Sequence, residues 1–88
     1  MKIKGEFAVF QDKDSFVAVA EGDFKKEFGG MIKLNETGLL LWKKLYGGAT
    51  EEELCAELCR EYDIAEDVAL ADVKNFVSGL AEAGFIVE

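Results

Sequence analysis

The sequence predicts an α+β domain in which three antiparallel strands are followed by three helices. Over the first 34 residues, β-branched and aromatic side chains are frequent and alternate along the chain, which favours strands. From residue 35 onward, apolar residues recur at helical spacing, and glycines and capping residues divide this part into three segments. Strands gathered in one half of a chain and helices in the other are typical of α+β domains.

The first two strands are predicted at residues 7–12 and 16–20. The Asp12–Asp14 segment between them is polar and has the length of a hairpin connection, so these strands are expected to be antiparallel neighbours. Residues 21–30 contain three glycines and are predicted to form a polar loop. Met31–Leu34 is then predicted to be a third, short strand.

The first two helices have recognisable ends in the sequence. The side-chain oxygen of Asn35 can accept a backbone N–H of the first helical turn, and the Gly47-Gly48 pair suits the left-handed conformation that commonly ends a helix. Thr50 and Glu53 have the spacing of a capping box, in which each residue accepts a backbone N–H from the other. The second helix is therefore expected to begin directly after Thr50.

A polar turn at residues 63–66 leads into the third helix, which is predicted to end at Gly84. Apolar residues at three- and four-residue spacing mark the inner faces of the second and third helices. They are Leu54, Leu58 and Tyr62, with Cys55 beside them, and Ala69, Val73, Phe76, Val77 and Leu80. Residues 85–88 are expected to form a short, mainly apolar tail.

The length and composition support a single domain over residues 1–88. Half of the residues are hydrophobic, too many for a disordered chain, yet no stretch approaches the roughly 20 apolar residues that span a bilayer. The basic N-terminal residues are not followed by an apolar region, so no secretory signal is expected. Two cysteines are too few for a disulfide scaffold. We therefore expect a cytoplasmic protein without a membrane partner.

The formal net charge of −8 belongs to the second half of the chain. Residues 1–50 contain eight lysines and seven acidic residues, whereas residues 51–88 contain Arg60 and Lys74 against eleven acidic residues. A winged-helix DNA-binding domain also combines three helices with a sheet, but its recognition helix must bring basic side chains to phosphates and base edges. The acidic helices therefore argue against nucleic acid as a partner.

The sequence lacks the residues that catalytic and metal sites require. Without histidine, neither a Ser-His nor a Cys-His pair can form. Cys55 and Cys59 could present two thiolates from one helix, but a metal site needs about three or four ligands, so we interpret them as small buried or half-buried residues. The carboxylates at 51–53 and 66–67 lie in first turns of helices, where they favour the helix dipole. No cofactor, no metal and no enzymatic activity are expected.

The segment Gly30–Gly38, which reads GMIKLNETG, resembles the PqqD-like family, whose members are also called RiPP recognition elements. The similarity continues in the right order over nearly the whole chain. It includes Trp42, Leu45, Gly47, Gly48, Thr50, Leu54, Leu58, Tyr62, Asp72, Val73, Phe76, Leu80, Gly84, Phe85 and Ile86. The Asn35–Gly38 junction departs from members dedicated to pyrroloquinoline quinone biosynthesis, which favours service to another modified peptide.

The resemblance implies a winged-helix-like domain that binds the leader of a ribosomally made precursor peptide and delivers it to a modifying enzyme, often a radical SAM enzyme. The leader is expected to add as a strand along Met31–Leu34, because an edge strand offers unpaired N–H and C=O groups, in a groove walled by the third helix. Lys33 and Lys74 would suit an acidic leader residue. The expected peptide-binding residues are Met31, Ile32, Lys33, Leu34, Leu70, Val73, Lys74, Val77 and Ala81.

A second hypothesis is an acidic adaptor that docks on a basic surface of a partner enzyme without binding a leader. Charge complementarity would steer such an encounter. The docking face would be the acidic side of the second helix, with Glu51, Glu52, Glu53, Glu57 and Glu61. The two hypotheses are compatible, because a free-standing recognition element must also meet its modifying enzyme.

Overall fold

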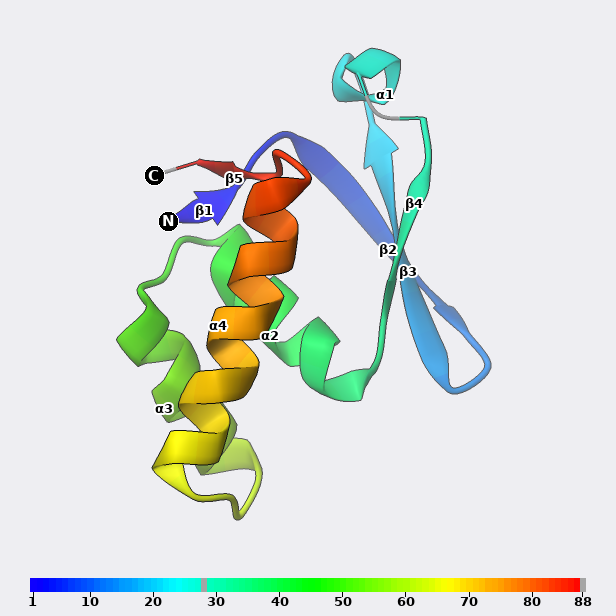
Figure 1. Ribbon diagram of the computed structural model, residues 1–88. Helices are drawn as coiled ribbons and strands as arrows, with labels where there is room; N and C mark the ends of the chain where they lie inside the picture. Colours follow the sequence, from blue (N-terminus) through cyan, green and yellow to red (C-terminus); the bar gives the residue numbers. More distant parts are fainter. Residues whose placement is uncertain (28, 88) are drawn as a thin grey trace. The chain divides into compact units, whose positions relative to one another are not determined.

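The computed structural model describes residues 1–27 and 29–87, which group into two compact units (Figure 1). The sheet unit lies within Gly5–Leu39, and the helical unit combines Met1–Lys4 with the residues from Leu40 onward. In chain order the elements are β1 (Lys2–Ile3), β2 (Glu6–Asp12), β3 (Ser15–Glu21), α1 (Phe24–Glu27), β4 (Met31–Leu34), α2 (Glu36–Tyr46), α3 (Glu51–Glu61), α4 (Glu66–Glu82) and β5 (Ile86–Val87). The predicted fold class is confirmed, because a three-stranded antiparallel sheet is followed by three helices.

The three long strands form one antiparallel sheet in the order β2-β3-β4, with β3 in the centre. Opposite Val17 of β3 lie Phe10 of β2 and Lys33 of β4, and opposite Ala18 lie Val9 and Ile32. Side chains alternate between the two faces of a strand, so this register assigns every residue to a face. We call inner the face with the buried Phe7, Ala18, Ala20 and Leu34, and outer the face with Ala8, Phe10, Val17, Val19, Met31 and Lys33.

The starts of α2 and α3 and the end of α2 lie at the predicted capping residues. The Oδ1 atom of Asn35 accepts the backbone N–H of Gly38 at 2.7 Å, and Gly48, just after α2, has a φ of +98°. Thr50 and Glu53 form the predicted capping box: the Thr50 hydroxyl accepts the Glu53 N–H at 3.1 Å, and the Glu53 carboxylate accepts the Thr50 N–H at 2.9 Å. These caps satisfy N–H groups that have no partner within the helix.

The core of the helical unit lies where α3 packs against α4. Leu54 and Leu58 of α3 and Ala69 and Val73 of α4 have no exposed surface, and all four belong to the predicted apolar stripes. Tyr62, which was predicted on the inner face of α3, instead follows the last helical residue in an extended conformation and is half-buried. Among the described residues, none of the helices is both long and apolar enough for a membrane span.

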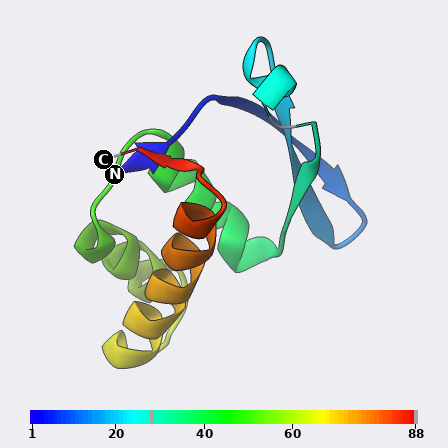
Figure 2. The same cartoon turned by 45° about the horizontal axis from the view of Figure 1, so that its top comes forward.

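Two predictions about irregular segments were wrong. The loop predicted at 21–30 contains the short helix α1, and the tail predicted at 85–88 contains β5, which pairs with β1. Lys2 lies opposite Val87 and Ile3 opposite Ile86, so both ends of the described chain lie side by side (Figures 1 and 2). Strands of two residues are too short to leave a periodic pattern in the sequence. Residues 28 and 88, which these predictions included, lie outside the described residues.

Candidate functional site

The open edge of β4 is one of the two edges of the three-stranded sheet to which another chain could add. Within the described part of the chain, β4 pairs with β3 on one side, and no strand pairs with its other side. The backbone groups that point to that side can accept or donate the ladder hydrogen bonds of an added strand. β2 is the other edge of the same sheet. The predicted edge position of the third strand is thus confirmed.

The four side chains of β4 divide between the two faces of the sheet. Met31 and Lys33 lie on the outer face and are exposed, Met31 by 62% of its surface. Ile32 and Leu34 lie on the inner face, where Ile32 is half-buried and Leu34 is only 4% exposed. A strand added at this edge would therefore meet exposed side chains on the outer face and a half-buried isoleucine on the inner one.

The predicted residues of α4 differ widely in exposure. Val73 is fully buried, whereas Lys74 and Ala81 are exposed. Leu70 is 37% exposed and lines an open pocket of about 520 Å³ together with residues of α3, among them Cys55. Val77 is 8% exposed and lines a second pocket beside the first turn of α3. Leu70 and Val77 thus lie on the α3 side of α4, while Val73 belongs to the core.

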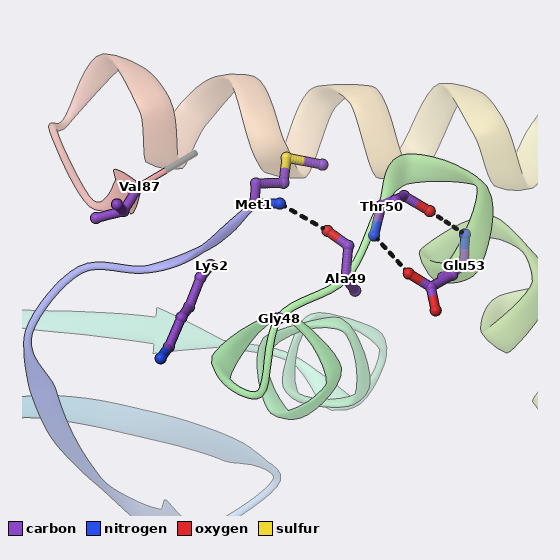
Figure 3. A pocket seen from close by; sticks show the side chains of 7 residues that line it. All are labelled: Met1, Lys2, Gly48, Ala49, Thr50, Glu53 and Val87. Atoms are coloured by element: carbon purple, nitrogen blue, oxygen red, sulfur yellow. Dashed lines mark hydrogen bonds between the residues drawn. The ribbon is translucent and has the colours of Figure 1, made fainter.

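A third pocket, of about 370 Å³, lies where the N-terminal residues meet the start of α3 (Figure 3). The Met1 amino group donates to the Ala49 carbonyl at 3.1 Å, and the Ala49 N–H donates to the Met1 carbonyl at 2.9 Å. The carboxylate in this pocket, Glu53, already accepts the Thr50 N–H, and Lys2 points away from it. This arrangement joins the start of the chain to the helices and leaves no free acid and base facing each other among the lining residues.

Comparison with known proteins places the chain in a family. The family model described as "Coenzyme PQQ synthesis protein D (PqqD)" matches residues 11–86. The chain belongs to the PqqD family. A comparison with curated proteins gave no match. The predicted family is confirmed, and since PqqD-family proteins are non-catalytic peptide-binding proteins, so is the prediction that this chain is not an enzyme.

Two solved structures share the fold of this PqqD-family chain. One is "TbiB1 in Complex with the TbiA(beta) Leader Peptide", with a TM-score of 0.76, 24% sequence identity, and coverage of 97% of this chain and 93% of the other. The second is "Lasso peptide synthetase B1 complexed with the leader peptide", with a TM-score of 0.74, 23% identity, and coverage of 99% and 96%. At these identities the similarity establishes the fold.

The two cysteines of this PqqD-family chain are placed for packing. Cys55 is buried, and its thiol lies 3.7 Å from the Glu66 carbonyl oxygen; Cys59 is half-buried one turn later. Burial raises the pKa of the Cys55 thiol, and the neighbouring Cys59 raises it further. The thiol therefore stays protonated and is a poor nucleophile at neutral pH. The described residues contain no group of three or more side chains suited to hold a metal ion.

The acidic side of α3 is less open than its sequence indicates. Glu57, predicted on the docking face, is only 9% exposed, and its carboxylate accepts hydrogen bonds from Arg60. Lys44 of α2 lies 3.9 Å from the same carboxylate. Of the five acidic residues predicted on this docking face, Glu52, Glu53 and Glu61 are therefore exposed, and Glu51 is half-buried.

Sequence reasoning missed several exposed apolar residues, and among the described residues outside the predicted site Phe10 and Val68 are the most exposed of them. Phe10 is 59% exposed on the outer face, in the same cross-strand row as Lys33, and Val68 of α4 is 49% exposed. Residues two positions apart on a helix are about 200° apart around its axis, so Val68 lies on the side of α4 opposite Leu70. For Phe10, the alternation of Phe7 and Val9 with Ala8 and Phe10 already showed that the two pairs lie on opposite faces of the strand. It did not show which of the two faces is buried.

The capping box predicts how stability depends on pH. The Thr50 N–H donated to Glu53 holds the pKa of that carboxyl below its ordinary value of 4.5. A lowered pKa in the folded state means that the carboxylate stabilises the fold above the unfolded-state pKa, and this contribution is lost as the pH falls through the folded-state pKa. Urea unfolding should therefore show Glu53→Gln less stable than the parent at about pH 7, with a smaller difference at about pH 3.

The matched control is Glu52→Gln, which makes the same change in charge one residue earlier. Glu52 makes no capping hydrogen bond in the structure, so its replacement should lower stability less at neutral pH. Equal differences for Glu53→Gln at both pH values would contradict the role assigned to the charge in the capping box.

Proposed function

We propose that this protein binds the leader of a ribosomally synthesised precursor peptide by strand addition to β4 and delivers the precursor to a modifying enzyme. The observation that carries the proposal is the open edge of β4 in a PqqD-family chain. Edge strands bind extended peptides through main-chain hydrogen bonds, and pockets for alternate side chains supply specificity. Both solved structures that share the fold are complexes with leader peptides, which supports the same function here.

In this proposal the whole chain acts as one peptide-binding domain. Met31, Ile32 and Lys33 contact the leader directly, while Leu34 and Val73 are too buried to do so and support the elements that carry the site. The exposed part of Leu70 and the exposed Lys74 and Ala81 belong to the proposed α4 wall. Val77, with 8% of its surface exposed, contributes to that wall at its border with the core.

The enzyme that receives the precursor is proposed to be a radical SAM enzyme, and the modified product to differ from pyrroloquinoline quinone. No cofactor is assigned to the chain itself. The acidic-adaptor hypothesis keeps support from the exposed Glu52, Glu53 and Glu61 of α3, as a surface for the enzyme rather than as a separate function. DNA binding has no supporting observation, because the helices of the second half carry a large excess of acidic residues.

The test is a titration of ¹⁵N-labelled protein with a synthetic leader from the precursor gene that neighbours its own. We expect amide shifts at residues 31–34 and 70–81, and affinity at least about tenfold higher than for a scrambled leader of the same composition. A leader that binds no better than the scrambled peptide would contradict the proposed function. Shifts at the β2 edge instead of β4 would contradict the proposed binding site.

A further inference from the structure

The outer face of the sheet ends at β4 with two side chains of different character. Across the three strands, one row consists of Ala8, Val19 and Met31, and the next consists of Phe10, Val17 and Lys33. Met31 is 62% exposed, so an exposed apolar side chain ends its row at the open edge. Lys33 provides the only cationic side chain on this face among the described strands.

A strand added to β4 would continue both rows by one residue each. Residues directly opposite each other on neighbouring strands have Cβ atoms about 4.5–5.5 Å apart, close enough for their side chains to interact. The leader residues opposite Met31 and Lys33 are two positions apart in the leader, because side chains of one strand return to the same face with a period of two. The residue between them lies on the inner face, beside Ile32.

We propose that the leader is recognised on the outer face by an apolar side chain beside Met31 and an acidic side chain, two residues away, beside Lys33. This inference rests on the proposed function. It adds a sequence requirement: an apolar and an acidic residue separated by one position. The apolar residue covers the exposed Met31, and the acidic residue pairs with Lys33, where a basic residue would be repelled.

The order of the two leader residues also reports the direction of the added strand. Met31 precedes Lys33 in β4. An antiparallel leader therefore meets Lys33 first and reads acidic, any residue, apolar from its N-terminus, while a parallel leader reads apolar, any residue, acidic. Either order satisfies the inference, and a leader that needs neither residue type at this spacing contradicts it.

Met31 allows a direct test, because the chain contains only two methionines. With ¹³C-methyl-labelled methionine, the Met31 methyl should shift on addition of the neighbouring gene's leader and show nuclear Overhauser effects to one apolar leader side chain. Met1, which lies in the other unit, is the internal control and should not respond. Amide shifts at residues 31–34 without any response of the Met31 methyl would overturn this inference and leave the proposed function standing.

Variants give the second arm of the test. Met31→Thr, which keeps strand propensity, should weaken leader binding about 5- to 10-fold, whereas Phe10→Thr should change it less than about 2-fold. Phe10 shares the outer face but lies on β2, three strand spacings or about 14 Å from the added strand. If Phe10→Thr weakens binding as much as Met31→Thr, a larger partner covers the whole face and the inference is wrong.

For the acidic residue, a charge exchange is decisive. Lys33→Glu should weaken binding about 5-fold at low salt, and a leader with lysine in place of its acidic residue should recover that loss. Lys13→Glu makes the same charge change in the β2–β3 turn, beyond the rows that reach β4, and should have little effect. Lack of recovery by the exchanged leader would contradict the pairing with Lys33. If the leader binds neither the unmodified protein nor any of its variants, the proposed function itself is contradicted.

Discussion

Replacement of Leu58 by alanine is expected to lower the free energy of unfolding by about 2–5 kcal/mol, the range for a leucine removed from a packed core. Leu58 has no exposed surface, and the helix that carries it, α3, packs against α4. The truncation loses buried apolar area and leaves a cavity that the helices fill only in part. Domains of this length are stable by roughly 4–13 kcal/mol, so this loss is a substantial share of the total stability. Urea denaturation monitored by circular dichroism measures the change.

The matched control is Leu70→Ala, the same chemical change on α4 at a residue that is 37% exposed. Its cost should be about 1 kcal/mol, because much of that side chain is in water already. The pair separates burial from helix propensity, since both sites are helical and alanine is the better helix former at each. Equal losses for the two variants would contradict the assignment of the core to the α3–α4 contact.

Methylation of backbone nitrogens in the leader is expected to weaken binding strongly at every second residue and little at the residues between. In an added strand, the N–H groups of alternate residues point to β4, and those of the intervening residues point away. Methyl groups on two nitrogens that point to β4 remove two ladder hydrogen bonds and introduce steric clashes. Affinity should fall about 100-fold, from about 0.5–1.5 kcal/mol per hydrogen bond plus the clash. Isothermal titration calorimetry on the intact protein gives the affinities.

The control is the same leader methylated at the two intervening positions. It carries the same number of methyl groups and the same conformational bias, and it should bind within about 3-fold of the unmodified leader. If both methylated leaders lose the same affinity, the leader does not pair with a strand edge. It would then be bound through side-chain contacts alone. This experiment therefore tests the strand-addition mode separately from the identity of the ligand.

Features set by neighbouring residues were predictable from the sequence. The Asn35 cap and the Thr50–Glu53 capping box depend on residues three positions apart, so the sequence alone places the starts of α2 and α3. The short third strand was likewise predicted, and the sheet order puts it at an edge. Its role in binding stays a prediction, as do the roles of the α4 residues.

Features that depend on distant residues were not predictable. Both sets of alternating side chains in β2 contain apolar residues, so the exposure of Phe10 becomes visible only from the burial of the opposite face. Glu57 looks like a solvated acidic residue, but Lys44 of α2 lies 3.9 Å from its carboxylate once the helices pack. α1 is a single turn, too short for periodicity. The sequence pattern predicts Val73 both in the apolar core and among the peptide-binding residues. Its full burial agrees with the first of these predictions.

The β1–β5 pair has a consequence for the order in which the chain folds during synthesis. Ile3 meets Ile86 near the opposite end of the chain, so the helical unit is complete only when the last strand has left the ribosome. All pairings of the β2-β3-β4 sheet join residues of the first 34, and local pairings form faster than distant ones. The sheet can therefore form during translation, with the β4 edge open to other nascent chains. The shortness of β4 and the charge of Lys33 limit such pairing, so the edge that we propose for leader binding also carries features that counter aggregation of the newly made protein.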